Sequence, residues 1–257
     1  LNAPPRNAFP LTGRMPVHNV SFVYFDLDDT LLDHTHAERQ ALSDVRDRYL
    51  EIFGTLSVDA LQERYHTMNA PLWTKYADGA VDKATVKHER FARLLDAVGA
   101  PHAHPGRIQR YYMQRYAEHW RFVPGARDAF IRIASHMPVG VLTNGFAEVQ
   151  AKKFDRFPVL REQAAAVVVC ENHGPLKPHP DAFAYATAQT EADAGSILYV
   201  GDSWRSDVQG GRSAGWRVAW YAPNGTNGRA VDTGGFDFGS WDVLVDRLRS
   251  RPAASAS

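Results

Sequence analysis

Three short apolar runs, each followed at once by polar residues, constrain the fold of this chain more than any other feature of its sequence. They are Val20 to Phe25, Val139 to Leu142 and Ile197 to Val200. Short runs rich in branched and aromatic residues are typical of strands that are buried on both faces of a parallel sheet. Because helical patterns lie between these runs, we predict an α/β fold, a Rossmann-like doubly wound parallel sheet with helices on both faces.

Further segments fit this alternation of strand and helix. Two more strands are predicted at Ala165 to Cys170 and at Trp216 to Trp220. Helical patterns are found at Ala126 to Ser135, Pro180 to Gln189, Asp207 to Ala214 and Trp241 to Leu248. The last of these is amphipathic, and we expect it to pack back on the sheet.

The stretch between Asp33 and Phe122 carries no strand pattern. It contains four helical stripes, which begin at Leu42, Val58, Phe91 and Ile108, and Ser57 is well placed as the N-cap of the second. We therefore predict an α-helical cap at 33–122, inserted into a core made of residues 20–32 and 123–250. Residues 1–19 and 251–257 are expected to be loose termini, with Met15 as a candidate native start.

The charge balance bears on the partners of the protein. The 257 residues include 29 Lys plus Arg and 29 Asp plus Glu, so the formal net charge is zero. This balance favours neither nucleic acid nor a membrane surface, and we expect neither as a partner. The single cysteine, Cys170, excludes an internal disulfide, and no apolar run approaches the ~20 residues of a membrane span. We expect a cytoplasmic protein, either a monomer or a homodimer.

The first strand ends in three carboxylates, within Phe25-Asp26-Leu27-Asp28-Asp29-Thr30. Open α/β sheets bind their ligands at the carboxyl ends of the strands. A regular strand would point Asp26 and Asp28 to the same face, and two like charges that close are costly unless a cation or a proton lies between them. The alternative is a surface turn followed by an acidic N-cap.

Three later segments also place polar residues after predicted strands. Thr143 and Asn144 follow the second strand with a hydroxyl and backbone N–H groups that suit a phosphate, although Asn-Gly is also a common turn. Lys177 offers a cation before a helix, where a solvated surface lysine is the alternative. Asp202 and Asp207 add oxygen ligands that suit Mg²⁺, and Asp207 fits equally well as an acid in the first turn of a helix.

In this order and at strand ends, the four segments resemble the motifs of the haloacid dehalogenase superfamily. The matching residues are Asp26, Asp28, Thr30, Thr143, Lys177, Asp202 and Asp207. The resemblance extends from about Val20 to Leu248, and a helical insert directly after the first motif is the cap arrangement of that superfamily's first subclass.

The resemblance implies a role for each residue. Asp26 would be the nucleophile that forms an aspartyl-phosphate, and Asp28 would protonate the leaving alcohol, for which we expect a raised pKa. Mg²⁺ would be held by Asp26, the backbone oxygen of Asp28 and Asp202, with Asp207 supporting from nearby. Thr143, the N–H of Asn144 and Lys177 would stabilise charge on the phosphoryl oxygens.

The second acid of the first motif separates two reaction types. Dehalogenases of the superfamily lack an acid at the place of Asp28, because halide leaves without a proton, so the resemblance favours a phosphatase that acts on a small phosphate ester. A mutase that returns the phosphoryl group to a sugar remains an alternative, and so does a non-catalytic binding module, against which the complete motif set argues.

The predicted cap resembles that of house-cleaning pyrimidine 5′-nucleotidases around Asn69-Ala70-Pro71-Leu72-Trp73. Trp73 would stack on a base and Asn69 would bind its edge, which predicts a nucleoside 5′-monophosphate as substrate. The alternative for Trp73 is a place in the core of the cap, and the alternative substrates are a sugar phosphate or phosphoglycolate. The His34/His36 and His102/His104 pairs have no third ligand in evident reach, so we expect them to be solvated.

Overall fold

The computed structural model describes residues 19–231 and 234–249. The predicted loose terminus at 251–257, all but the last residue of the one at 1–19, and Met15 as a start lie outside the described residues. Within them, no helix is long and apolar enough to cross a membrane.

Six strands form one parallel sheet, in the order β3-β2-β1-β4-β5-β6. The strands are β1 (Phe22–Phe25), β2 (Val139–Thr143), β3 (Ala164–Val169), β4 (Ile197–Gly201), β5 (Arg217–Tyr221) and β6 (Phe236–Phe238). The order reverses beside β1, where β4 pairs with it on one side and β2 on the other. Ligand crevices of open α/β sheets form at such switch points, so the carboxyl ends of these strands are the place for a site.

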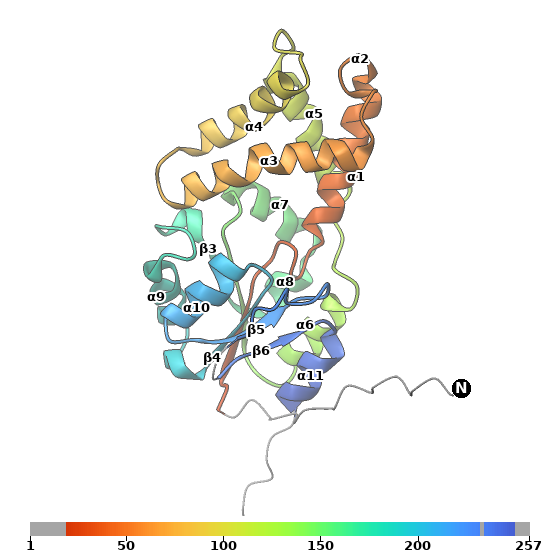
Figure 1. The fold of residues 1–257 in the computed structure, drawn as a ribbon. Coiled ribbons are helices and arrows are strands. Elements are labelled where there is room, and N and C mark those ends of the chain that lie inside the picture. Colours follow the sequence, from red (N-terminus) through yellow and green to blue (C-terminus); the bar gives the residue numbers. More distant parts are fainter. Residues whose placement is uncertain (1–18, 232–233, 250–257) are drawn as a thin grey trace, which may run out of the picture.

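Helices cover both faces of the sheet, as predicted (Figure 1). They are α6 (Ala126–Ala134), α7 (Ala147–Arg156), α8 (Val159–Glu162), α9 (Pro180–Ala188), α10 (Gly210–Ser213) and α11 (Trp241–Arg249). Phe130 of α6 and Leu244 of α11 pack with Phe25 in one apolar cluster. Phe183 of α9 packs with Tyr24 and Tyr199 in another. Successive side chains of β1 thus enter opposite cores, which is why its apolar run is continuous.

A separate group of helices forms between β1 and α6 and lies at one end of the molecule (Figure 1). These are α1 (His34–Arg48), α2 (Leu50–Phe53), α3 (Val58–Ala77), α4 (Lys83–Ala97) and α5 (Pro105–Glu118). Ser57 caps α3 as predicted, since its side chain accepts a hydrogen bond from the Ala60 N–H at 3.1 Å. The two segments that connect these helices to the sheet lie side by side, because Leu32 pairs with Phe122 and Arg121 donates to the Asp33 carboxylate at 2.8 Å.

The structure differs from the prediction in three places. The first cap stripe is two helices, α1 and α2, interrupted at Tyr49. The segment predicted as a helix from Asp207 begins earlier, as a π-helix at Trp204–Gln209 that continues into α10. Strand β6 and helices α7 and α8 were not predicted, because each is short or lacks a continuous apolar stripe.

The packing of α6 on β1 gives a stability prediction. Phe130 is fully buried, with its ring 5.3 Å from that of Phe25, so Phe130→Ala leaves a cavity and should lower the free energy of unfolding by about 3–5 kcal/mol. The measurement is urea unfolding followed by circular dichroism. Leu50 is 58% exposed, so the control Leu50→Ala should change that free energy by no more than about 0.5 kcal/mol. Equal losses in both variants would contradict the packing argument.

Candidate active site

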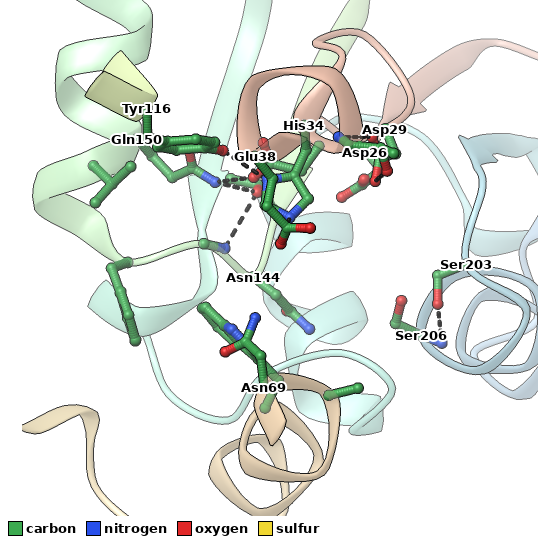
Figure 2. A pocket seen from close by; sticks show the side chains of 18 of the residues that line it. Asp26, Asp29, His34, Glu38, Asn69, Tyr116, Asn144, Gln150, Ser203 and Ser206 are labelled. Carbon is green, nitrogen blue, oxygen red and sulfur yellow. Dashed lines mark hydrogen bonds and ion pairs between the residues drawn. The ribbon is translucent and has the colours of Figure 1, made fainter. Parts of the chain in front are cut away.

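A cavity of about 430 Å³ lies between the carboxyl edge of the sheet and the helices α1, α3, α4 and α5 (Figure 2). Its walls contain every residue that the sequence singled out as catalytic or substrate-binding, together with Asp202. These are Asp26, Asp28, Asn69, Trp73, Thr143, Asn144 and Lys177. A volume of this size is within the range of small-molecule sites, roughly 300–1,000 Å³.

Asp26 and Lys177 form the centre of the site. The Lys177 Nζ donates to Asp26 Oδ1 at 2.7 Å and to Asp207 Oδ1 at 2.9 Å, and it also contacts the Tyr199 hydroxyl. Burial by itself lowers the pKa of Lys177, but the charges of Asp207 and Asp26 outweigh this effect and raise it. The ammonium therefore stays charged. Lys177 is buried, which excludes the alternative that it is a solvated surface lysine.

The loop after β2 holds Lys177 in place. The Asn144 amide donates to the Lys177 carbonyl and accepts from its N–H, both at 2.8 Å. The Asn144 side chain is thus committed to the backbone of Lys177, which leaves the backbone N–H of Asn144 as the group suited to an anion. The Thr143 hydroxyl accepts from Gln150 Nε2 at 2.9 Å and from the Gly145 N–H at 3.4 Å, so its own hydrogen is available to donate into the cavity.

Three carboxylates converge beside this loop. Asp26, Asp202 and Asp207 each offer an oxygen atom within 4.8 Å of the other two. Burial first, and then the charges of Asp207 and Asp26, raise the pKa of Asp202 well above its usual range. Burial likewise raises the pKa of Asp26, to about 7, against the lowering effect of Lys177. A divalent cation would relieve this repulsion, and an all-oxygen donor set fits Mg²⁺.

Asp207 is held by the segment that follows β4. Its carboxylate accepts from the Ser203 N–H at 2.9 Å and from the Ser206 hydroxyl at 3.1 Å, in addition to Lys177. A Cβ at Gly201 would lie 2.5 Å from Asp207 Oδ2, so only glycine allows this approach. Asp202 accepts from the Thr30 hydroxyl at 3.0 Å. Asp207 therefore supports the cluster, while the second carboxylate oxygens of Asp26 and Asp202 accept no hydrogen bond within the described residues and could face a cation.

Asp28 has different partners from Asp26. Gln150 Nε2 donates to Asp28 Oδ2 at 2.8 Å, and Lys153 forms an ion pair with Oδ1. Burial alone would raise the pKa of Asp28, but the Lys153 and His34 charges and the hydrogen bonds from Lys153 and Gln150 lower it. The expectation of a raised pKa for Asp28 is therefore wrong for the free protein, because α7 places an ammonium against this carboxylate.

The cap supplies Asn69 and Trp73 from one helix, α3, where a spacing of four residues puts both on the same face. Asn69 is 7% exposed and lines the cavity, and Figure 2 shows its amide extending inward. The Trp73 ring stacks on Phe146, with the ring centroids 4.6 Å apart. Trp73 thus has an aromatic partner from the loop after β2 and also lines the cavity.

Sequence reasoning missed several residues of the cavity wall. Gln150 and Lys153 lie three residues apart on α7 and face Asp28, where their polar side chains interrupt the apolar stripe by which helices are found. His34 was expected to be solvated, but it is half-buried, lines the cavity and binds the Tyr116 hydroxyl at 2.7 Å. The available signal was that Gln150 and Lys153, three residues apart, would share one face of a helix that starts just after Asn144-Gly145. His102 and His104 are exposed, as expected.

Comparisons with known proteins agree with this geometry. A family model described as haloacid dehalogenase-like hydrolase matches residues 21–215. The pyrimidine 5′-nucleotidase YjjG of Escherichia coli is 28% identical over 77% of this chain and 84% of its own. A glyceraldehyde 3-phosphate phosphatase of Pyrococcus abyssi is 27% identical over 79% of this chain and 81% of its own. The magnesium-bound crystal structure of the HAD-hydrolase YfnB from Bacillus subtilis matches 90% of this chain and 99% of its own, with a TM-score of 0.77 and 26% identity.

The carboxylate cluster gives a metal-binding prediction. Mg²⁺ should raise the melting temperature of the wild type, because a ligand at a hundred times its Kd adds about 2.7 kcal/mol of stability. Asp202→Asn should lose this response and should melt higher than the wild type in EDTA, since one of the repelling charges is gone. Asp237 is exposed on β6, so Asp237→Asn is the control and should respond as the wild type does. A full response to Mg²⁺ in Asp202→Asn would contradict the assignment.

Proposed function

Because this chain belongs to the haloacid dehalogenase-like hydrolases, we propose that it is a magnesium-dependent phosphatase that hydrolyses a small phosphomonoester through an aspartyl-phosphate on Asp26. The family includes both dehalogenases and phosphatases by the resemblance set out above. One acidic residue decides between these reactions.

The observation that carries the proposal is Asp28, which lines the same cavity as Asp26. A halide leaves without a proton, whereas an alkoxide needs one, so a second acid serves only the cleavage of an ester. Asp28 is ionised in the free protein. A phosphoryl group bound at Asp26 is a like charge and shifts the pKa of Asp28 upward, toward the form that donates a proton to the leaving alcohol.

The reaction then uses the residues in sequence. As substrate binds, Asp28 takes up a proton from solvent. An Asp26 oxygen then attacks phosphorus as the bond to the alcohol oxygen breaks, and Asp28 gives that proton to the departing oxygen. Asp28 next takes a proton from the water that hydrolyses the aspartyl-phosphate. Lys177, the Thr143 hydroxyl and the N–H of Asn144 stabilise charge on the phosphoryl oxygens throughout.

The metal site is assigned to Asp26, the backbone oxygen of Asp28 and Asp202, with Asp207 supporting. When bound, Mg²⁺ offsets the repulsion between the anionic nucleophile and the phosphate. Support for it comes from the three carboxylates, Asp26, Asp202 and Asp207, whose oxygens converge within 4.8 Å, because carboxylate oxygens are ligands that suit Mg²⁺.

For the substrate we propose a nucleoside 5′-monophosphate. Asn69 and Trp73 line the cavity from α3 and offer an amide and an aromatic ring to a base. The name of YjjG, a pyrimidine 5′-nucleotidase, supports this choice, and that of the P. abyssi enzyme, a glyceraldehyde 3-phosphate phosphatase, supports a sugar phosphate as the second candidate. A sugar-phosphate mutase differs from both in that it releases little inorganic phosphate.

Phosphate release tests the chemistry. The wild type should release inorganic phosphate from phosphomonoesters only with Mg²⁺, and Asp26→Asn should lower the rate by at least about 1,000-fold, because removal of a nucleophile leaves only binding and electrostatic stabilisation. In acid-quenched single-turnover reactions, mass spectrometry should find a phosphoryl group on the peptide that contains Asp26 in the wild type and none on that peptide in Asp26→Asn. Asp237→Asn is again the matched control. Inversion of configuration at a chirally labelled phosphorus, in place of the retention that two successive displacements give, would show direct attack by water and reject the aspartyl-phosphate.

The substrate panel tests the cap. It contains pyrimidine and purine nucleotides, sugar phosphates and phosphoglycolate, each compared by kcat/KM. We expect a nucleotide to be the best substrate. A sugar phosphate or phosphoglycolate that outperforms every nucleotide would reject the nucleotidase proposal and leave the phosphatase intact.

A further inference from the structure

Three polar side chains on the cap wall of the cavity are buried and incompletely satisfied. Arg90 of α4 is 5% exposed, Asn69 of α3 is 7% exposed and Glu38 of α1 is 1% exposed. Among the described residues, no hydrogen-bond partner is found for Arg90 Nε, Asn69 Oδ1 or Glu38 Oε2. All three residues line the cavity that holds Asp26. A buried polar atom without a partner is destabilising, so a ligand that supplies the missing hydrogen bonds would be favoured at this wall.

Arg90 is the most unusual of the three. Within residues 19–231 and 234–249 no ion pair to Arg90 is found; its Nη2 donates to the weak acceptor Met113 Sδ at 3.2 Å, the guanidinium also hydrogen-bonds the Tyr65 side chain, and Nε has no partner. The guanidinium also lies 5.5 Å from the centres of the Phe91 and Tyr112 rings. These rings hold the group in a fixed place and supply little hydrogen bonding. A guanidinium presented in this way needs an acceptor oxygen from the substrate.

The other two side chains limit what kind of oxygen that is. Glu38 accepts from Gln62 at 3.1 Å and pairs with His66, and its second oxygen lies 3.7 Å from His34 Nε2. Burial alone would raise the pKa of Glu38, but the hydrogen bond from His66 and the charges of His34 and His66 lower it, so Glu38 is ionised. A substrate carboxylate or second phosphate would face this charge and also Asn69 Oδ1. The wall therefore favours a neutral group that has both a donor and an acceptor.

We propose that Arg90 and Asn69 determine specificity by binding a lactam edge, a carbonyl oxygen beside a ring N–H, on the leaving group of the substrate. This inference rests on the proposed function, because the base of a nucleoside 5′-monophosphate is such a leaving group. Arg90 donates to the carbonyl oxygen. The Asn69 amide accepts from the ring N–H and donates to the carbonyl oxygen, which is the bidentate pattern that a planar amide offers. Aromatic residues of the wall, Tyr65 and Trp73 among them, suit the flat ring that carries this edge.

Matched nucleotides isolate the lactam edge. Uridine and cytidine 5′-monophosphates differ in that edge and share size, sugar and phosphate, and inosine and adenosine 5′-monophosphates form the same comparison among purines. With the full-length protein and Mg²⁺, the wild type should prefer uridine to cytidine by about tenfold or more in kcat/KM, because a buried donor left unpaired rejects the wrong partner. Inosine 5′-monophosphate should likewise have a higher kcat/KM than adenosine 5′-monophosphate.

Variants test the assignment to residues. Arg90→Met should reduce the uridine-to-cytidine ratio about tenfold, Asn69→Ala should reduce it as well, and Arg90→Lys should lie between Arg90→Met and the wild type. A ratio measured within one preparation does not depend on the fraction of folded protein, so partial misfolding cannot imitate the result. Arg93 lies on the same helix, is partly exposed and pairs with Glu89 at 3.1 Å. Arg93→Met is therefore the matched control, and its uridine-to-cytidine ratio should equal that of the wild type.

The outcomes separate the inference from the proposed function. Release of phosphate from p-nitrophenyl phosphate but from no nucleotide would reject the nucleotide substrate. Hydrolysis of nucleotides with a ratio near one in the wild type, or with the same ratio in Arg90→Met as in the wild type, would overturn the lactam assignment and leave the nucleotidase standing.

Discussion

The buried ammonium of Lys177 is the contact on which the rest of the site depends. It lies between Asp26 and Asp207, at 2.7 Å and 2.9 Å, where the carboxylates would otherwise repel one another. Removal of one partner from a buried ion pair costs about 3–5 kcal/mol, because an uncompensated charge remains. Two features of the sequence serve this contact. Asn144 fixes the backbone of Lys177, and Gly201 lets the Asp207 carboxylate approach β4. The loop after β2 and the acidic cluster are therefore one unit.

A second lysine, Lys153, makes the pKa of Asp28 differ from that of Asp26, which lies two residues earlier. Asp26 shares Lys177 with Asp207 and remains crowded by carboxylates, so its pKa is raised, first by burial. Asp28 turns to α7, where Lys153 and Gln150 offset its burial and lower its pKa. In the free protein this order is opposite to the one that the proposed roles need, so a cation beside Asp26 and a bound phosphate beside Asp28 must reverse it, the first by favouring the ionised nucleophile and the second by favouring the protonated acid. Helix α7 follows closely on the loop after β2. Gln150 of this helix therefore contacts both Asp28 and the Thr143 hydroxyl.

The parts of the site that could be predicted are those that strand order brings together. Asp26, Thr143 and Asp202 each follow a predicted strand, and parallel strands meet at one edge with their carboxyl ends. Lys177 was assigned by resemblance, since no local pattern distinguishes a buried lysine from a solvated one. Lys153 was missed for the reverse reason: its helix turns polar side chains inward. Burial of a charged residue is decided by tertiary partners, which local periodicity does not contain.

The contacts between the cap and the core differ in strength. Lys83 pairs with Glu171 at 2.8 Å and Arg205 with Asp78 at 2.8 Å, and such partly exposed pairs contribute at most about 1 kcal/mol each. The stack of Trp73 on Phe146 is different, since Phe146 continues the loop that carries Thr143. Weak pairs of this kind would oppose an opening of the cap only slightly, whereas the stack joins a cap residue to the loop after β2. The wall proposed for recognition and the site proposed for chemistry are thereby joined through Phe146, which the rings of both Trp73 and Tyr76 contact.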